Sequence, residues 1–193
     1  NAFFSESFID ELAAATKQDP LAFRLNWLKD APRYAAVLKL ATSKAGWGTP
    51  RPTGRAQGLA LHESFGSIVA QVAEVSVDNG QIRVHRVVCA IDCGTVVNPD
   101  TVAQQVESSV IYGLSAALFG QINIVGGVVQ QSNFPSYPLV TLSQAPQVET
   151  HIVPSTRHPA GVGEPAVPPI APAVANALFA LTGKRQRALP LVV

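Results

Sequence analysis

A short loop near the C-terminal end of the sequence holds the carboxylate best placed to do chemistry. Its residues are Gly161-Val162-Gly163-Glu164-Pro165. The two glycines allow a ligand to approach the backbone closely, and the proline stiffens the step after the carboxylate. A rigid glutamate on a loop that leads into a helix can act as a general base. From the residues alone, the alternative that Glu164 is an ordinary solvated glutamate stays open.

A second group of polar side chains lies early in a helix expected to begin near residue 99. Gln104 and Gln105 are followed one turn later by Ser108 and Ser109. Free backbone donors near a helix start can hold an anionic ligand. The alternative is that these residues are the polar face of an amphipathic helix.

Other common catalytic patterns are missing from the sequence. No pair of histidines has the close spacing of a helical zinc motif, and no phosphate loop or dinucleotide fingerprint occurs. The segment around Ser115 lacks the second glycine of a nucleophile elbow. We therefore expect structural or surface histidines and find neither nucleophile nor base for a hydrolase. The histidines are His62, His85, His151 and His158.

The composition indicates a protein that is covered in part by another segment or chain. Of the 193 residues, 47% are hydrophobic and only 14% are charged, whereas about a quarter is usual. The net charge of +1 gives no electrostatic case for nucleic acid. No apolar run approaches the roughly 18 residues that a membrane span needs. On a strand, Cys89 and Cys93 would lie roughly 13 Å apart, so we expect two buried thiols rather than a disulfide.

The elements that must position these residues begin with three expected helices. The first is predicted to be capped by Ser7 and Asp10, with Phe8, Ile9 and Leu12 as its apolar face. The second opens at Asp19-Pro20, and the third ends at Gly46. Residues 46–58 are rich in glycine and proline and are predicted to form a connecting loop. We expect a helical segment over 1–48 and an α+β portion over 49–193.

The rest of the chain predicts hairpins and two more helices. Residues 68–77 and 82–88 alternate as strands around Asn79-Gly80, the strongest short hairpin signal. Asn98-Pro99 opens a helix whose apolar residues recur every four positions. A second hairpin over 121–131, a strand over 148–153 and a helix over 173–182, ended by Gly183, follow. This mixture predicts an α+β fold of antiparallel hairpins packed with helices.

Several segments together resemble the molybdenum-cofactor-binding large subunit of the xanthine oxidase family. The similarity is greatest to the C-terminal part of its isoquinoline 1-oxidoreductase beta-subunit and aldehyde dehydrogenase type. The segments that carry it are Gly163-Glu164-Pro165, Pro168 to Ala177, Thr182 to Leu191, Glu6 to Leu12, Asp19-Pro20-Leu21, Val88 to Gly94 and Val97-Asn98-Pro99.

The resemblance implies a molybdenum-dependent oxidoreductase that oxidises an aldehyde or an N-heterocycle with oxygen derived from water. It gives Glu164 the role of general base, and it places Gln105, Val162 and Gly163 against the pterin, with no direct metal ligand. The implied cofactor is molybdopterin, in its cytosine dinucleotide form, with molybdenum. Implied partners are an iron–sulfur or cytochrome electron-transfer subunit, with iron–sulfur clusters or haem, and a small-molecule substrate. The compartment stays open between cytoplasm and periplasm.

Two departures from the family pattern limit these expectations. The family usually has two glycines after the helix glutamine and its following glutamate, whereas Ser108 and Ser109 stand here. The sequence also lacks the family's other glycine-rich cofactor loops, so we expect the remaining part of the subunit to be needed for binding. The alternative is a non-catalytic assembly fragment of that family without cofactor, which predicts an exposed apolar patch where the rest would dock.

Overall fold

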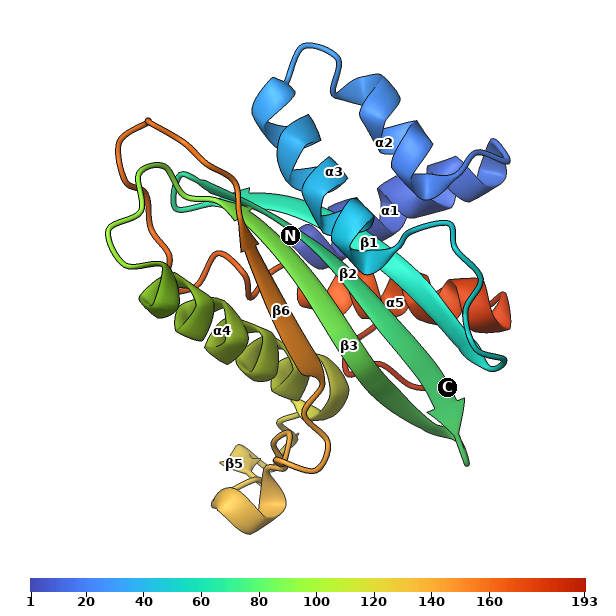
Figure 1. The fold of residues 1–193 in the computed structure, drawn as a ribbon. Helices are drawn as coiled ribbons and strands as arrows, with labels where there is room; N and C mark the ends of the chain where they lie inside the picture. The colour runs from blue at the N-terminus through green and yellow to red at the C-terminus, as the bar shows by residue number, and fades with distance from the viewer.

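The structure, a computed structural model, describes residues 1–193. Five α-helices and six strands follow one another along the chain (Figure 1). In order they are α1 (Ala2–Ala15), α2 (Pro20–Trp27), α3 (Pro32–Ala45), β1 (Arg55–Ser64), β2 (Ser67–Asp78), β3 (Gln81–Asp92), α4 (Pro99–Phe119), β4 (Ile124–Val125), β5 (Val128–Val129), the 3-10 turn η1 (Phe134–Ser136), β6 (Gln147–Ile152) and α5 (Ile170–Thr182).

A four-stranded sheet with the order β1-β2-β3-β6 forms the centre of the fold. The first three strands are antiparallel neighbours, which confirms the predicted α+β class. The edge strand β6 differs, because it runs parallel to β3. A parallel pair needs a long crossover connection, and here α4 and the segment after it supply that connection (Figure 1).

Helices cover both faces of this sheet (Figure 1). On one face, α3 packs through Val37, Leu38 and Ala41 against even-numbered residues of β2 such as Ile68 and Ala70. On the other face, α4 and α5 pack against the odd-numbered residues. Since successive strand residues point to opposite faces, and both faces are covered, β2 is buried along most of its length. This explains its nearly continuous run of apolar residues.

Four of the predicted helix start and stop signals and the predicted hairpin turn are confirmed. The Asp19 side chain accepts hydrogen bonds from two amides at the start of α2, and Asn98 does the same for α4. Gly46 and Gly183 end α3 and α5 in the left-handed conformation. Asn79-Gly80 forms the turn between β2 and β3, where Asp78 pairs with Gln81.

Strand β1 was not predicted, and the expected loop over 46–58 is too long. The connection ends at Gly54, and Gly58 lies within the strand. A side chain at Gly58 would lie 2.1 Å from the amide nitrogen of Ala177 and 2.3 Å from the carbonyl oxygen of Ala173. The glycine therefore lets α5 lie directly on β1. Composition alone does not reveal this reason for a glycine inside a strand.

The predicted capping box and apolar face of the first helix are wrong. Helix α1 begins at Ala2 after Asn1, so Ser7 and Asp10 lie inside it and are buried. Phe8 is 58% exposed, and the buried face instead carries Glu6.

This polar face is buried because arginines of other elements bind it. Arg24 lies 3.1 Å from Glu6, and Arg185 lies 2.7 Å from Asp10. Buried charges of this kind occur in pairs because an isolated charge is costly to bury.

Both cysteines are free and buried, as expected from their spacing. Burial raises the pKa of the Cys89 thiol to about 12. No helix combines the length and apolar character needed to cross a bilayer. The division into a helical segment over 1–48 and an α+β portion over 49–193 stays an interpretation.

Candidate functional site

The loop that carries Glu164 lies between β6 and α5, and its two halves differ in burial. Gly163 and Glu164 are exposed, whereas Pro165 and Ala166 are buried. The amide of Val167 donates to the carbonyl oxygen of Glu164 at 3.0 Å, which closes a turn just before α5. The carboxylate therefore projects from a fixed turn whose following residues belong to the core.

The beginning of the loop is fastened to the turn between β1 and β2. The amide of Gly161 donates to the Phe65 carbonyl at 3.0 Å, and the Ser67 hydroxyl donates to the Gly161 carbonyl at 2.6 Å. A Cβ atom at Gly161 would lie 2.8 Å from the Cβ atom of Phe65. Only glycine fits this close approach without a shift of the neighbouring backbone.

Two further side chains hold the loop on either side of Glu164. The Ser109 hydroxyl of α4 donates to the Gly163 carbonyl at 3.1 Å. The Gln71 side-chain amide of β2 donates to the Ala166 carbonyl at 2.7 Å. The serine at position 109, where the resemblance predicts glycine, thus supplies a hydrogen bond to the loop. Sequence reasoning missed Gln71, although a polar residue between the apolar residues Val69 and Ala73 on one face of β2 was a usable signal.

Helix α4 brings Gln105 to the same loop. Its Val102 and Val106 share a core cluster with Ala166, against which Val162 also packs. Gln105 is half-buried and lies four residues before Ser109, and residues with this spacing are neighbours on a helix surface, about 6 Å apart. Since Ser109 contacts Gly163, the structure gathers Gln105 and the glutamate loop on one side of α4.

Hydrogen-bond donors in the loop are free to bind a ligand. The amides of Val162, Gly163 and Glu164 make no hydrogen bond within the chain. A Cβ atom at Gly163 would meet nothing within 4 Å, so the space before it is open. Successive free amides suit an anionic or hydrogen-bonding ligand. Their position beside Glu164 and Gln105 fits an organic cofactor held mainly by the backbone.

Three of the four histidines lie on different strands of the sheet and not on this loop. His62, His85 and His151 belong to β1, β3 and β6, and burial lowers the pKa of each imidazole. They are therefore mostly neutral at neutral pH. The chain gathers no cluster of three metal-ligating side chains from histidine, cysteine, aspartate and glutamate.

Asp92, at the end of β3, fixes the turn at Gly94. The segment that leads to the glutamate loop passes close to this turn at His158. The Asp92 carboxylate lies 2.7 Å from Arg33 and accepts from the Gly94 amide at 3.1 Å. Burial alone would raise the pKa of Asp92, but these two partners hold it below its ordinary value. The carbonyl of His158 passes 2.1 Å from where a Cβ atom of Gly94 would lie, so this crossing also needs a glycine.

Comparison with known proteins identifies the family. Residues 24–146 match the model of the molybdopterin cofactor-binding domain. The chain is 38% identical to the beta chain of the isoquinoline 1-oxidoreductase of Brevundimonas diminuta, covering 98% of this chain and 25% of that protein. It is 35% identical to a subunit of the nicotinate dehydrogenase of Pseudomonas putida, covering 99% of this chain and 18% of that protein. It is 34% identical to the membrane-bound aldehyde dehydrogenase of Gluconacetobacter polyoxogenes, covering 96% of this chain and 27% of that protein.

Solved structures agree with these sequence matches. The CO dehydrogenase of Oligotropha carboxidovorans superposes with a TM-score of 0.53 at 26% identity, over 59% of this chain and 16% of that one. The quinoline 2-oxidoreductase of Pseudomonas putida 86 shares the fold with a TM-score of 0.59 at 20% identity, over 64% of this chain and 17% of that one. The chain thus spans about a quarter or less of these relatives' length. It belongs to the molybdopterin cofactor-binding domain family of the xanthine oxidase type, as the resemblance of several of its segments implied.

Proposed function

We propose that this chain is part of a molybdenum hydroxylase or dehydrogenase in which Glu164 is the general base. The observation that carries the proposal is an exposed carboxylate on an anchored loop, beside free backbone donors and Gln105. The proposed substrate is an aldehyde or an N-heterocycle. The names of the relatives, which refer to isoquinoline, nicotinate and aldehyde, support this class.

Each residue of the loop has a distinct proposed role. The free amides of Val162 and Gly163 and the side-chain amide of Gln105 bind the molybdopterin, in its cytosine dinucleotide form. The half-buried Val162 side chain packs against the core, so its backbone amide is the group proposed to bind the cofactor. When bound, the molybdenum cofactor supplies the two-electron redox chemistry. The Glu164 carboxylate accepts the proton of the water-derived nucleophile, which a positioned carboxylate can do efficiently.

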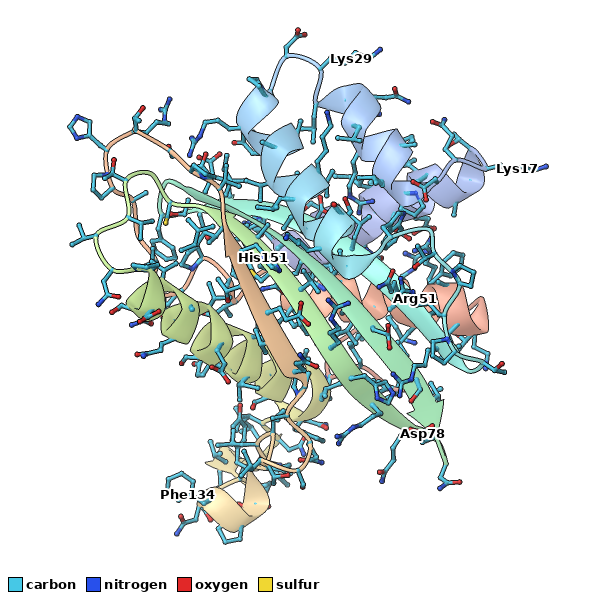
Figure 2. All side chains as sticks on the ribbon, viewed as in Figure 1. Lys17, Lys29, Arg51, Asp78, Phe134 and His151 are labelled. Carbon is cyan, nitrogen blue, oxygen red and sulfur yellow. The ribbon has the colours of Figure 1, made fainter.

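The proposed partners include the remaining part of the molybdenum subunit. Residues 108–148 contain no charged side chain and no histidine. Within them, the arm over 120–146 projects from the sheet, and Phe134 points away from the fold at its tip (Figures 1 and 2). Phe134 is 83% exposed and Leu142 is 95% exposed. An uncharged arm that exposes several large apolar side chains is suited to burial against protein. An iron–sulfur or cytochrome subunit would then carry electrons away.

The test compares Glu164→Gln with wild type in the complete enzyme. The matched control is Glu63→Gln, since Glu63 is also exposed but lies on β1 beside Tyr34. We expect Glu164→Gln to keep wild-type molybdenum and pterin content and to lose turnover by a factor of about 10² to 10⁴, while the control keeps both. Equal turnover by Glu164→Gln would refute the base role. An assembly that never contains molybdenum would favour the non-catalytic alternative.

A further inference from the structure

Gln71 is a fully buried polar side chain in the middle of an apolar strand. Its exposed fraction is 0%, and its neighbours on the same face of β2 are Val69 and Ala73. The side-chain amide donates to the Ala166 carbonyl at 2.7 Å, across 95 positions of sequence. Its carbonyl oxygen Oε1 has no hydrogen-bond partner. A buried acceptor without a partner opposes folding, so the structure retains this glutamine in spite of a cost.

Ser109 makes the corresponding contact from the other side. It is 3% exposed and its hydroxyl donates to the Gly163 carbonyl at 3.1 Å. Position 163 is one residue before Glu164, and position 166 is two residues after it. The glutamate is therefore held between a carbonyl fixed by α4 and a carbonyl fixed by β2.

The two contacts act on the backbone and leave the carboxylate free. Neither Gln71 nor Ser109 bonds to the Glu164 side chain, which is exposed. Besides these two contacts, the backbone of the glutamate is held by the bond from the Val167 amide to the Glu164 carbonyl, whereas the amides of Gly163 and Glu164 make no hydrogen bond in the chain. Small displacements of a catalytic group cost much of its rate, about 10²-fold for 1 Å. Holding the adjacent carbonyls is thus an effective way to place the carboxylate.

We propose that Gln71 and Ser109 are positioning residues that fix the Glu164 loop from β2 and α4. The inference rests on the proposed role of Glu164 as the base. It predicts that removal of either side-chain donor lowers kcat by a factor of about 10 to 100. It also predicts an almost unchanged KM and an unchanged molybdenum content, because neither side chain is exposed to a ligand.

The experiment uses Gln71→Met and Ser109→Ala in the complete enzyme. Gln71→Met removes the donor and the unpartnered acceptor while keeping the length of the side chain. Ser109→Thr keeps the hydroxyl and is expected to retain more of kcat than Ser109→Ala. Hydrogen exchange is measured in parallel for the Gly161 amide, which donates to the Phe65 carbonyl, and for the Val167 amide, which donates to the Glu164 carbonyl. The exchange of both amides is expected to accelerate in both donor-free variants.

Two matched controls separate positioning from general structural damage. Gln57 lies on β1 and donates the same kind of hydrogen bond to the Ala45 carbonyl at 2.9 Å, away from the loop. Ser115 is a buried serine of α4 whose hydroxyl donates to the Ile111 carbonyl and accepts from the Val140 amide, and neither partner belongs to the glutamate loop. Gln57→Met and Ser115→Ala are expected to keep wild-type kcat and wild-type loop exchange.

The outcomes distinguish this inference from the proposed function. If Glu164→Gln is inactive while Gln71→Met and Ser109→Ala keep wild-type kcat and loop exchange, the positioning role is refuted and the base role stands. If Glu164→Gln keeps wild-type turnover, the proposed function fails instead. A fall in kcat shared equally by the two controls would also overturn the inference, because the effect would then be a loss of packing.

Discussion

Replacement of Gly58 by alanine tests the close packing of α5, the helix that follows the glutamate loop, on β1. The added Cβ atom would lie 2.1 Å from the Ala177 nitrogen, whereas ordinary contact begins at 3.4 Å. The difference, 3.4 − 2.1 = 1.3 Å, is the distance by which α5 must retreat from β1. The three atoms nearest to the new methyl group all belong to backbone, so no flexible side chain can yield.

The expected cost lies at the upper end of the range for overpacked cores, about 3 kcal/mol. For a domain of this size, about 2–4 °C of melting temperature corresponds to each kcal/mol, so we expect a decrease of about 6–12 °C. Helix α5 begins only six residues after Glu164, so its retreat would also displace the loop. The variant is therefore expected to lose turnover as well as stability.

The assay is thermal unfolding of the purified, cofactor-free protein, followed by circular dichroism. Gly163→Ala is the control, because a Cβ atom there meets nothing within 4 Å, and its melting temperature should stay within about 1 °C of wild type. A Gly58→Ala protein that melts within about 2 °C of wild type would refute the close packing of α5 on β1.

Three further predictions concern charge and the cofactor. Arg24→Met leaves the buried carboxylates of Glu6 and Asp10 without this partner, and should cost about 3–5 kcal/mol in chemical denaturation; a loss below about 1 kcal/mol would contradict it. The pKa of Asp92 is held below its ordinary value of 3.8, so its stabilising contribution is complete above that pH and is lost as pH falls through the lowered value. The stability difference between wild type and Asp92→Asn should therefore be constant above about pH 5 and shrink below 3.8; a difference that persists unchanged in acid would exclude this origin. Gly163→Ala in the complete enzyme should reduce molybdenum and pterin content, because the methyl group enters the open space before the free amides; full cofactor content would place the pterin elsewhere.

Several features that depend on neighbouring residues were predictable from the sequence. The turn at Asn79-Gly80, the caps at Asp19 and Asn98 and the helix end at Gly183 are all where the local rules place them. These positions are decided by backbone conformations and hydrogen bonds within a few residues. The loop motif around Glu164 was also visible, since it is contiguous in the chain.

Only the tertiary structure decided which surfaces and groups come together. The polar face of α1 is buried because Arg24 and Arg185 reach it from α2 and from beyond α5. Position 58 of β1 needs a glycine because α5, more than 110 residues later in the chain, lies directly on the strand there. The contact of Gln71 with the glutamate loop likewise spans 95 residues. Such partners are set by packing between distant segments, and the periodicity and spacing of a single segment carry no information about them.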